Sequence, residues 1–387
     1  MEGLLYLEDG TAYRGKGFGA SATNVGELVF NTAMAGYQGM LTDPAVAGLV
    51  INMTYPLVGN YGISEVDNQS GRVHALGLVA RDITFRPSNR CSVYSISEWL
   101  KGQGVPGVYN VDTRAITKKI RTAGTVKCLV STEGVSREQA QGLMESARLR
   151  GDYFADAGVG LRVIRRGSAA EGAPGRGLRV ALLDFGVKRG VVSALTSLGC
   201  DVTLCPYGTT AEEILAMGPD GLALPDGPGD PNECVRGVET AAGLIGRLPI
   251  FGIGMGHLVL ALAVGGRLDR LKFGHHGGNH GVRDLLTGRS AITGQGHMFA
   301  ANARSLEGSG MDVSHVNLND GTVEGMRHES LPAFSVQFHP EGAPGPNDSL
   351  GLFGCFVRMM LAVRAGTWAG TWEGTWEGTW EGGDFHA

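Results

Sequence analysis

Beyond residue 178 the sequence alternates short apolar runs with helical patterns, and this alternation limits the possible fold more than any other feature. The runs RVALLDFG (179–186) and CDVTLCPY (200–207) are typical of buried strands, and VKRGVVSALTSLG between them is typical of a helix with Gly199 just past its end. Strand, helix and strand in succession predict a parallel sheet wound with helices. Because ligands gather at the carboxyl ends of such strands, the loops that follow them hold the candidate site residues.

One of these loops lies in PIFGIGMGHLVLALAVGG (249–266), which reads as a strand, a tight glycine turn and an apolar helix. Many enzymes display a nucleophile on such an elbow, where small neighbours are needed because the turn is sharp. Here the central position, between Gly252 and Gly256, is Gly254. A dinucleotide-binding turn is disfavoured, since the fingerprint requires glycine where His257 stands and belongs on the first strand of a domain.

Composition shifts along the chain predict its organisation. Residues 1–150 form a first domain, in which strand-like runs alternate with Gly, Asp and Pro turns, and 151–177, rich in Gly, Arg, Ala and Ser, is a linker. Residues 178–364 form the wound sheet.

The tail, 365–387, repeats a four-residue unit containing Gly and Trp, and the glycines disfavour a helix. We expect the tail to be disordered, with an aromatic contact to a partner or another protomer as the alternative.

Composition also limits the function classes. A net charge of -5 gives no basic footprint for nucleic acid, and no apolar run reaches the ~20 residues that a membrane span needs. The N-terminus lacks the pattern of a signal peptide. The six cysteines are scattered without metal-ligand spacing, which is typical of reduced thiols. We therefore expect a cytoplasmic protein that binds neither nucleic acid nor membrane.

Several motifs occur in the order of one known family. In the second half these are DGPGDP (226–231), FGHHGGNH (273–280) and VQFHPEGAPGP (336–346). They resemble the class I glutamine amidotransferase domain of the carbamoyl phosphate synthetase small subunit. LEDGTAYRGKGFGA, VFNTAMAGYQGMLTDP, TYPLVGNYG, RPSNR and NVDTRAIT resemble that subunit's first domain. The resemblance implies an α/β fold with a mixed N-terminal domain and a C-terminal amidotransferase domain built on a doubly wound, mostly parallel sheet.

The resemblance also implies a chemistry, which this sequence interrupts. The family hydrolyses glutamine and sends ammonia through a tunnel to a large synthetase subunit. A cysteine thiolate attacks the amide carbon, a histidine acts as the base and a glutamate orients the histidine. By resemblance the histidine is His339 and the glutamate is Glu341, but the cysteine position is Gly254. Glycine cannot form a thioester, so we expect no thiol-dependent glutaminase activity.

Further departures fall in the substrate pocket that the resemblance implies. Leu258 stands where the family has glutamine, Ala45 where it has serine, Gly296 where it has asparagine and Met298 where it has glycine. Each lost polar contact should weaken glutamine binding by about 1 kcal/mol. Gly227 and Gly229, whose backbone N–H groups would face an oxyanion, are retained, and so is Phe299. The implied pocket comprises Ala45, Gly227, Gly229, Met255, Leu258, Gly296, Met298 and Phe299.

Six histidines within a short span could suggest a metal site: His257, His275, His276, His280, His297 and His339. The resembling family shows histidine at these positions without metal, so we expect hydrogen-bonding roles, no metal ion and no cofactor.

Three functions fit these observations. The first is a non-catalytic small subunit that partners a large synthetase subunit running on free ammonia. The alternative is a repurposed enzyme, in which His339 and Glu341 act as a general base on a different small molecule in the remodelled pocket, in specialised metabolism. The third is a regulatory pseudoenzyme that binds a ligand without chemistry.

Overall fold

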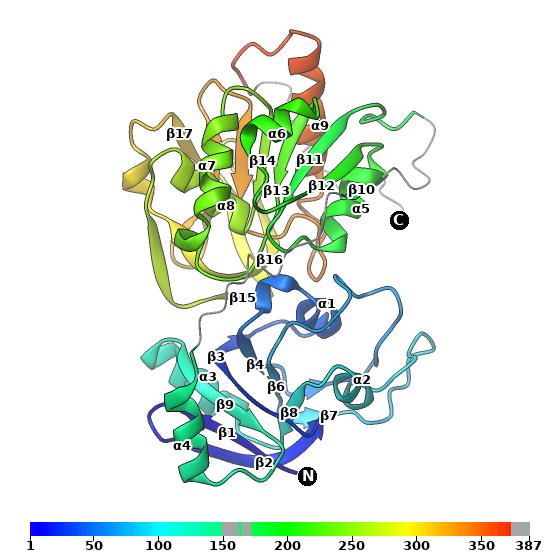
Figure 1. The fold of residues 1–387 in the computed structure, drawn as a ribbon, viewed down its shortest axis with the longest axis vertical. Coiled ribbons are helices and arrows are strands. Elements are labelled where there is room, and N and C mark those ends of the chain that lie inside the picture. The colour runs from blue at the N-terminus through cyan, green and yellow to red at the C-terminus, as the bar shows by residue number, and fades with distance from the viewer. Residues whose placement is uncertain (149–161, 165–171, 373–387) are drawn as a thin grey trace. The chain divides into compact units, whose positions relative to one another are not determined.

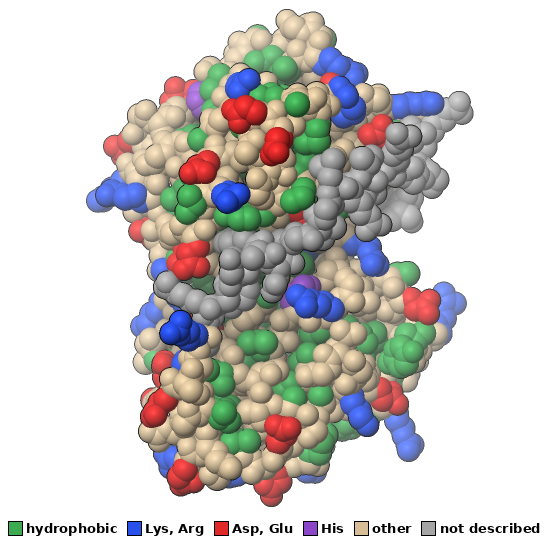
Figure 2. Space-filling model, in the orientation of Figure 1, with side chains coloured by type: hydrophobic (Ala, Val, Ile, Leu, Met, Phe, Trp, Pro, Cys, Tyr) green, Lys and Arg blue, Asp and Glu red, His purple; other side chains and the backbone are tan. Residues whose placement is uncertain are grey.

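The structure, a computed structural model, describes residues 1–148, 162–164 and 172–372, which divide into two compact units (Figure 1). Unit 1 comprises Met1–Gly151 together with Leu271–Gly278, and unit 2 comprises Asp152–Arg270 and Asn279–Ala387. No helix in the described ranges combines the length and the hydropathy that a membrane crossing requires. On the face drawn in Figure 2, acidic and basic side chains are interspersed on each unit.

Unit 1 is built on a closed barrel in the strand order β1-β2-β8-β6-β4-β3-β9, with a separate two-stranded sheet of β5 and β7. Its strands are β1 Glu2–Leu7, β2 Ala12–Gly19, β3 Thr23–Asn31, β4 Leu49–Met53, β5 Leu57–Val58, β6 Gly77–Val79, β7 Asp82–Ile83, β8 Pro106–Tyr109 and β9 Val126–Ser131. Its helices are α1 Tyr37–Leu41, the 3-10 turn Pro44–Val46, α2 Ile96–Gly102, α3 Thr113–Ala123 and α4 Arg137–Ser146.

The barrel closes because apolar residues alternate along its strands and pack inward. Leu5 and Leu7 of β1 share one buried cluster with Leu28 of β3 and Val130 of β9. Helix α3 covers this cluster with Ile116 and Ile120, four positions apart on one face. The expected strands and late helices of the first domain are thus present.

A short segment from the second half of the chain completes unit 1. The backbone N–H of Thr125 donates to the carbonyl of Lys272 at 3.0 Å, and that of Thr32 donates to the carbonyl of His276 at 3.0 Å. Phe273 packs on Phe30 with ring centroids 5.6 Å apart. Because of these contacts, residues 271–278 belong to unit 1, although in the sequence they lie within the segment that forms the wound sheet.

Unit 2 contains a ten-stranded sheet in the order β10-β12-β11-β13-β14-β19-β18-β17-β15-β16. Its strands are β10 Arg162–Ile164, β11 Arg179–Asp184, β12 Asp201–Pro206, β13 Gly221–Leu224, β14 Ile250–Ile253, β15 Leu268–Asp284, β16 Ser290–Ala301, β17 Met311–Asn317, β18 Val323–His328 and β19 Ala333–Val336. Its helices are α5 Arg189–Ser197, α6 Ala211–Ala216, α7 Val235–Leu244, α8 Met255–Ala263 and α9 Gly351–Arg364, with 3-10 turns at Pro231–Glu233 and Ala303–Leu306.

The centre of this sheet is parallel and buried on both faces. β12, β11, β13, β14 and β19 pair in parallel, while β18 and β17 continue the sheet antiparallel. Along β11, Val180 and Leu182 pack in one cluster with α5 and α9, and Ala181 and Leu183 pack in the other with α6, α7 and α8. Helices therefore cover both faces, which confirms the doubly wound, mostly parallel sheet.

Two segments differ from the sequence-based expectation. Within the expected linker, Arg162–Ile164 adds β10 as an antiparallel edge strand beside β12.

At the start of the expected disordered tail, Trp372 is 6% exposed and packs edge-on against Phe334, with ring centroids 5.8 Å apart. Its indole N–H donates to the carbonyl of His328 at 2.8 Å, and that of Trp368 donates to the carbonyl of Ser330 at 3.0 Å. The apolar burial outweighs the flexibility of the intervening glycine; residues 373–387 lie outside the described residues.

Candidate active site

The elbow between β14 and α8 has the geometry of a nucleophile turn. Gly254 has φ 56° and ψ -111°, a left-handed conformation that L residues adopt only under strain, and its N–H donates to the carbonyl of Val336 at 3.0 Å. A Cβ on Gly256 would lie 2.0 Å from the carbonyl oxygen of Leu224. Gly256 therefore lets the turn approach β13 closely. At the tip of the turn, where a nucleophile would stand, Gly254 carries only hydrogen.

The carboxylate of Asp226 occupies the space in front of Gly254. Its Oδ1 accepts hydrogen bonds from the backbone N–H of Gly227 at 2.9 Å and of Met255 at 2.8 Å. A Cβ built on Gly254 would lie 2.3 Å from the same oxygen. An elbow enzyme uses the N–H after its nucleophile, together with one from a neighbouring loop, to hold the oxyanion. Both of these donors are engaged by Asp226.

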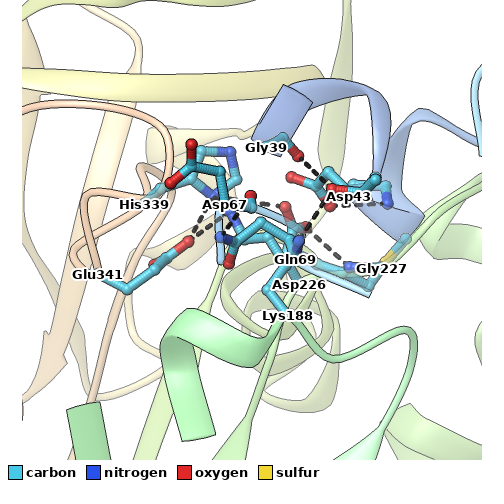
Figure 3. Close-up of polar contacts among 12 residues, drawn as sticks. Gly39, Asp43, Asp67, Gln69, Lys188, Asp226, Gly227, His339 and Glu341 are labelled. Atoms are coloured by element: carbon cyan, nitrogen blue, oxygen red, sulfur yellow. Dashed lines mark hydrogen bonds and ion pairs between the residues drawn. The ribbon is translucent and has the colours of Figure 1, made fainter. Parts of the chain in front are cut away.

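Beside Asp226, three buried side chains form a polar cluster (Figure 3). Nζ of Lys188 pairs with the carboxylate of Glu341 and lies 3.0 Å from Nδ1 of His339. That Nδ1 is 3.6 Å from Oε1 of Glu341 and 3.6 Å from Oδ2 of Asp226. Lys188 is 1% exposed, so its charge is removed from water and is compensated by the carboxylate of Glu341.

Lys188 determines which nitrogen of His339 can carry a proton. An ammonium has donors and no acceptor, so the contact at 3.0 Å makes Nδ1 of His339 the acceptor. The neutral ring then carries its hydrogen on Nε2, where a general base needs a lone pair. Glu341 contacts the ammonium of Lys188 and is too far from Nδ1 to accept a hydrogen bond from it. The expected pairing of base and orienter is thus interrupted by a cation.

Local structure brings these residues to one edge of the sheet. Lys188 precedes α5 in the loop after β11, where the side chain of Asp184 accepts from the N–H groups of Gly186 and Val187. Asp226 follows β13, and His339 follows β19, with its N–H donating to the carbonyl of Gly294 at 2.9 Å. The carboxyl ends of these parallel strands meet at one edge, as the alternation predicts.

The remaining expected pocket residues are distributed over both units. In unit 2, Met255 and Leu258 are buried on the first turns of α8, and Gly229 has φ 91°. Gly296 and Met298 lie two positions apart on one face of β16 and Phe299 on the other, and a Cβ on Gly296 would lie 3.3 Å from Nε2 of His339. Ala45 belongs to unit 1, where its N–H donates to the side chain of Asp43 at 2.9 Å.

Of the six cysteines, all of which lie in the described ranges, the five buried ones are poor replacements for the missing nucleophile. Cys91 is exposed in unit 1, and the other five are buried. Burial raises the pKa of the Cys234 thiol to about 12, that of Cys205 to about 11, those of Cys200 and Cys355 to about 12, and that of Cys128 further still. The buried thiols are therefore not ionised near neutral pH and are poor nucleophiles.

Two fully buried histidines, His257 on α8 and His315 on β17, are held neutral. Burial lowers the pKa of His257 to about 3, assisted by His315, and lowers that of His315 itself to about 4. Nδ1 of His257 is 2.9 Å from Oγ of Ser335, and Nδ1 of His315 is 2.9 Å from Oγ of Ser314. These contacts fit the expected hydrogen-bonding role.

These histidines predict a loss of stability in acid. Between pH 6.5 and about 4 the unfolded chain binds two protons that the folded chain does not, so the free energy of unfolding falls as the pH is lowered, by up to about 1.4 kcal/mol per pH unit for each histidine. Urea unfolding at pH 7.5, 6, 5.5 and 5 should show this slope, and His257→Asn should reduce it by about half. If His257→Asn changes the free energy of unfolding by the same amount at every pH, so that its pH dependence stays that of the unmodified chain, burial of neutral His257 is not the cause.

Sequence reasoning missed two members of the site, Lys188 and Asp226. Each had a signal. Lys188 lies just after the loop holding Phe185 and Gly186, one of those expected to meet at the sheet edge, and Asp226 is the first residue of DGPGDP. Neither side chain could be assigned a contact without the strand order, because they are 38 positions apart and a further 113 positions separate Asp226 from His339.

Comparisons with known proteins identify two domains along this chain. Residues 5–130 match the carbamoyl-phosphate synthase small chain, CPSase domain, and residues 181–359 match glutamine amidotransferase class-I. The chain is 48% identical over 359 residues to a carbamoyl phosphate synthase small chain of Clostridium acetobutylicum, covering 93% of this chain and 100% of that one. It is 45% identical over 357 residues to a small chain of Fusobacterium nucleatum, covering 92% and 97%. A pyrimidine-specific small chain of Bacillus subtilis is 40% identical over 360 residues, covering 93% and 96%.

Proposed function

Because the chain belongs to the carbamoyl phosphate synthase small chain family, we propose that it acts as a small subunit without thiol-dependent glutaminase activity. Its amidotransferase domain has the elbow of a glutaminase but no group on it that can attack an amide carbon. Its role is then to assemble with a large synthetase subunit that uses free ammonia.

One observation carries the proposal. At the elbow, the nucleophile position is Gly254, and the carboxylate of Asp226 fills the space in which a nucleophile and its oxyanion would lie. Without a thiolate no thioester forms, and the N–H groups of Gly227 and Met255, which Asp226 engages, are not available to a tetrahedral oxyanion. Removal of one such donor alone costs an enzyme about 100-fold to 1,000-fold in kcat.

The cluster around His339 favours this proposal over a repurposed enzyme. A general base on another small molecule needs a lone pair facing the substrate, whereas Lys188 engages Nδ1 and leaves the hydrogen on Nε2. Glu341 stabilises the ammonium of Lys188 and not an imidazolium. The polar cluster thus supports a structural role for His339 and Glu341.

Assembly with a large subunit is supported by the extent of similarity. The relatives are called small chains, and the identity of 40–48% extends over nearly the whole of their length, including the first domain. A chain that kept only a ligand-binding pocket would have no need of unit 1. Its retention favours a subunit over a free-standing regulatory protein.

The experiment combines the purified chain with a large synthetase subunit from one of these bacterial systems. We expect co-elution on size exclusion and carbamoyl phosphate formation from ammonia, with no formation from glutamine above that of the large subunit alone. A small chain that carries cysteine on its elbow serves as the control and should support both. Glutamine-dependent synthesis, or ammonia release from glutamine by the chain itself, would contradict the proposal.

A further inference from the structure

Asp226 lies where three separate requirements of amide hydrolysis converge. We propose that Asp226 holds the amidotransferase site closed, as a block that acts independently of the glycine at the elbow. This inference rests on the proposed function, since it concerns why the site is inactive. The inference goes further than the proposed function: a thiol restored to position 254 will not by itself make the site reactive.

The first requirement is space for the nucleophile. A Cβ on Gly254 would lie 2.3 Å from Oδ1 of Asp226, 2.4 Å from its Cγ and 2.9 Å from its Oδ2. All three separations are shorter than non-bonded carbon contacts, so a cysteine at 254 must displace the carboxylate or be displaced by it.

The second requirement is a free pair of oxyanion donors. Oδ1 of Asp226 accepts from the N–H groups of Gly227 and Met255 at 2.9 and 2.8 Å. A substrate carbonyl would have to take these hydrogen bonds from an anion that is already in place and is covalently part of the loop. A neutral carbonyl is a weaker acceptor than a carboxylate, so the exchange is unfavourable.

The third requirement is an electrostatic environment that stabilises a thiolate. Asp226 is 6% exposed, so water screens its charge little, and the ammonium of Lys188 in the same cluster is already paired with the carboxylate of Glu341. A like charge at that distance disfavours ionisation of the thiol to the thiolate, which is the attacking form.

The fold keeps Asp226 in this place. It lies just after the buried strand β13, Gly221–Leu224, and precedes Gly227, where a Cβ would lie 2.5 Å from the carbonyl oxygen of Phe185. The loop is therefore pressed against its neighbour and holds the carboxylate at the elbow. Oδ2 also lies 3.6 Å from Nδ1 of His339, beside the ammonium of Lys188.

The test compares variants in a Cys91→Ser background, in which the exposed native thiol is removed. The variants are Gly254→Cys alone and combined with Asp226→Ala, with Asp226→Asn or, as the matched control in the same loop, with Asp230→Ala. Alkylation by iodoacetamide of the thiol introduced at position 254 is followed by peptide mass spectrometry, and ammonia release from L-glutamine is measured in parallel.

We expect Gly254→Cys alone and with Asp230→Ala to react slowly and at similar rates. Adding Asp226→Ala should speed alkylation at least about tenfold, and Asp226→Asn, which removes charge but keeps volume, at least about threefold. If the alanine pair does not fold, the isosteric asparagine pair decides. Equal rates for Gly254→Cys with and without the Asp226 changes would overturn the inference.

The two proposals fail in different ways. Ammonia release from glutamine by the unmodified chain would overturn the proposed function, whatever the alkylation rates. Fast alkylation of Gly254→Cys alone would overturn the role of Asp226 and leave the proposed function intact, since the unmodified chain still has no thiol at the elbow.

Discussion

Replacing Lys188 by methionine should lower the free energy of unfolding of unit 2 by about 3–5 kcal/mol. Methionine keeps most of the apolar stem but removes the ammonium that pairs with Glu341 and faces His339. The carboxylate of Glu341, 7% exposed, would then be buried without its cation. Urea unfolding followed by tryptophan fluorescence measures the loss, since Trp372 is buried in unit 2.

A second substitution separates charge from packing in this prediction. Lys188→Met combined with Glu341→Gln removes the uncompensated charge and should recover a substantial part of the lost stability. Lys101→Met, at an exposed lysine of unit 1, should change stability by no more than about 0.5 kcal/mol. A Lys188→Met variant as stable as the unmodified chain would show that the cluster is not an ion-paired unit.

Gly256→Ala should destabilise unit 2 by about 3 kcal/mol or more, or prevent its folding. The added methyl would lie 2.0 Å from the carbonyl oxygen of Leu224, 2.5 Å from its carbon and 2.6 Å from its Cβ. These atoms belong to the strand beside the elbow, and a strand in the centre of a sheet cannot shift without breaking its ladder. Thermal and urea unfolding measure the effect.

The control for this substitution is another helical glycine of the same unit. Gly354 lies inside α9, and a Cβ there would meet only Nη1 of Arg358, the end of a flexible side chain, at 3.4 Å. Gly354→Ala should therefore be neutral or stabilise by up to about 1 kcal/mol, as expected for alanine in place of glycine in a helix. Similar losses at both glycines would mean that close approach to β13 is not the reason for Gly256.

Part of this protein follows from sequence alone, because local patterns carry it. The alternation of apolar runs and helical patterns after residue 178 predicted the wound sheet, since a period of two or of 3.6 residues selects strand or helix without knowledge of neighbours. The absence of a nucleophile is also a property of sequence: Gly254 stands on the elbow, and no fold can give glycine a thiol.

The tertiary structure decided which distant side chains meet and what fills the space in front of the elbow. Lys188, Asp226 and His339 follow three strands that become close only through the order β11-β13-β14-β19. Trp372 is buried because it packs against Phe334, although its own repeat predicts disorder. Periodicity describes a residue's own segment, whereas contacts depend on strand order, so the sequence showed that a side chain was missing and only the packing of β13 against the elbow showed that Asp226 lies in its place.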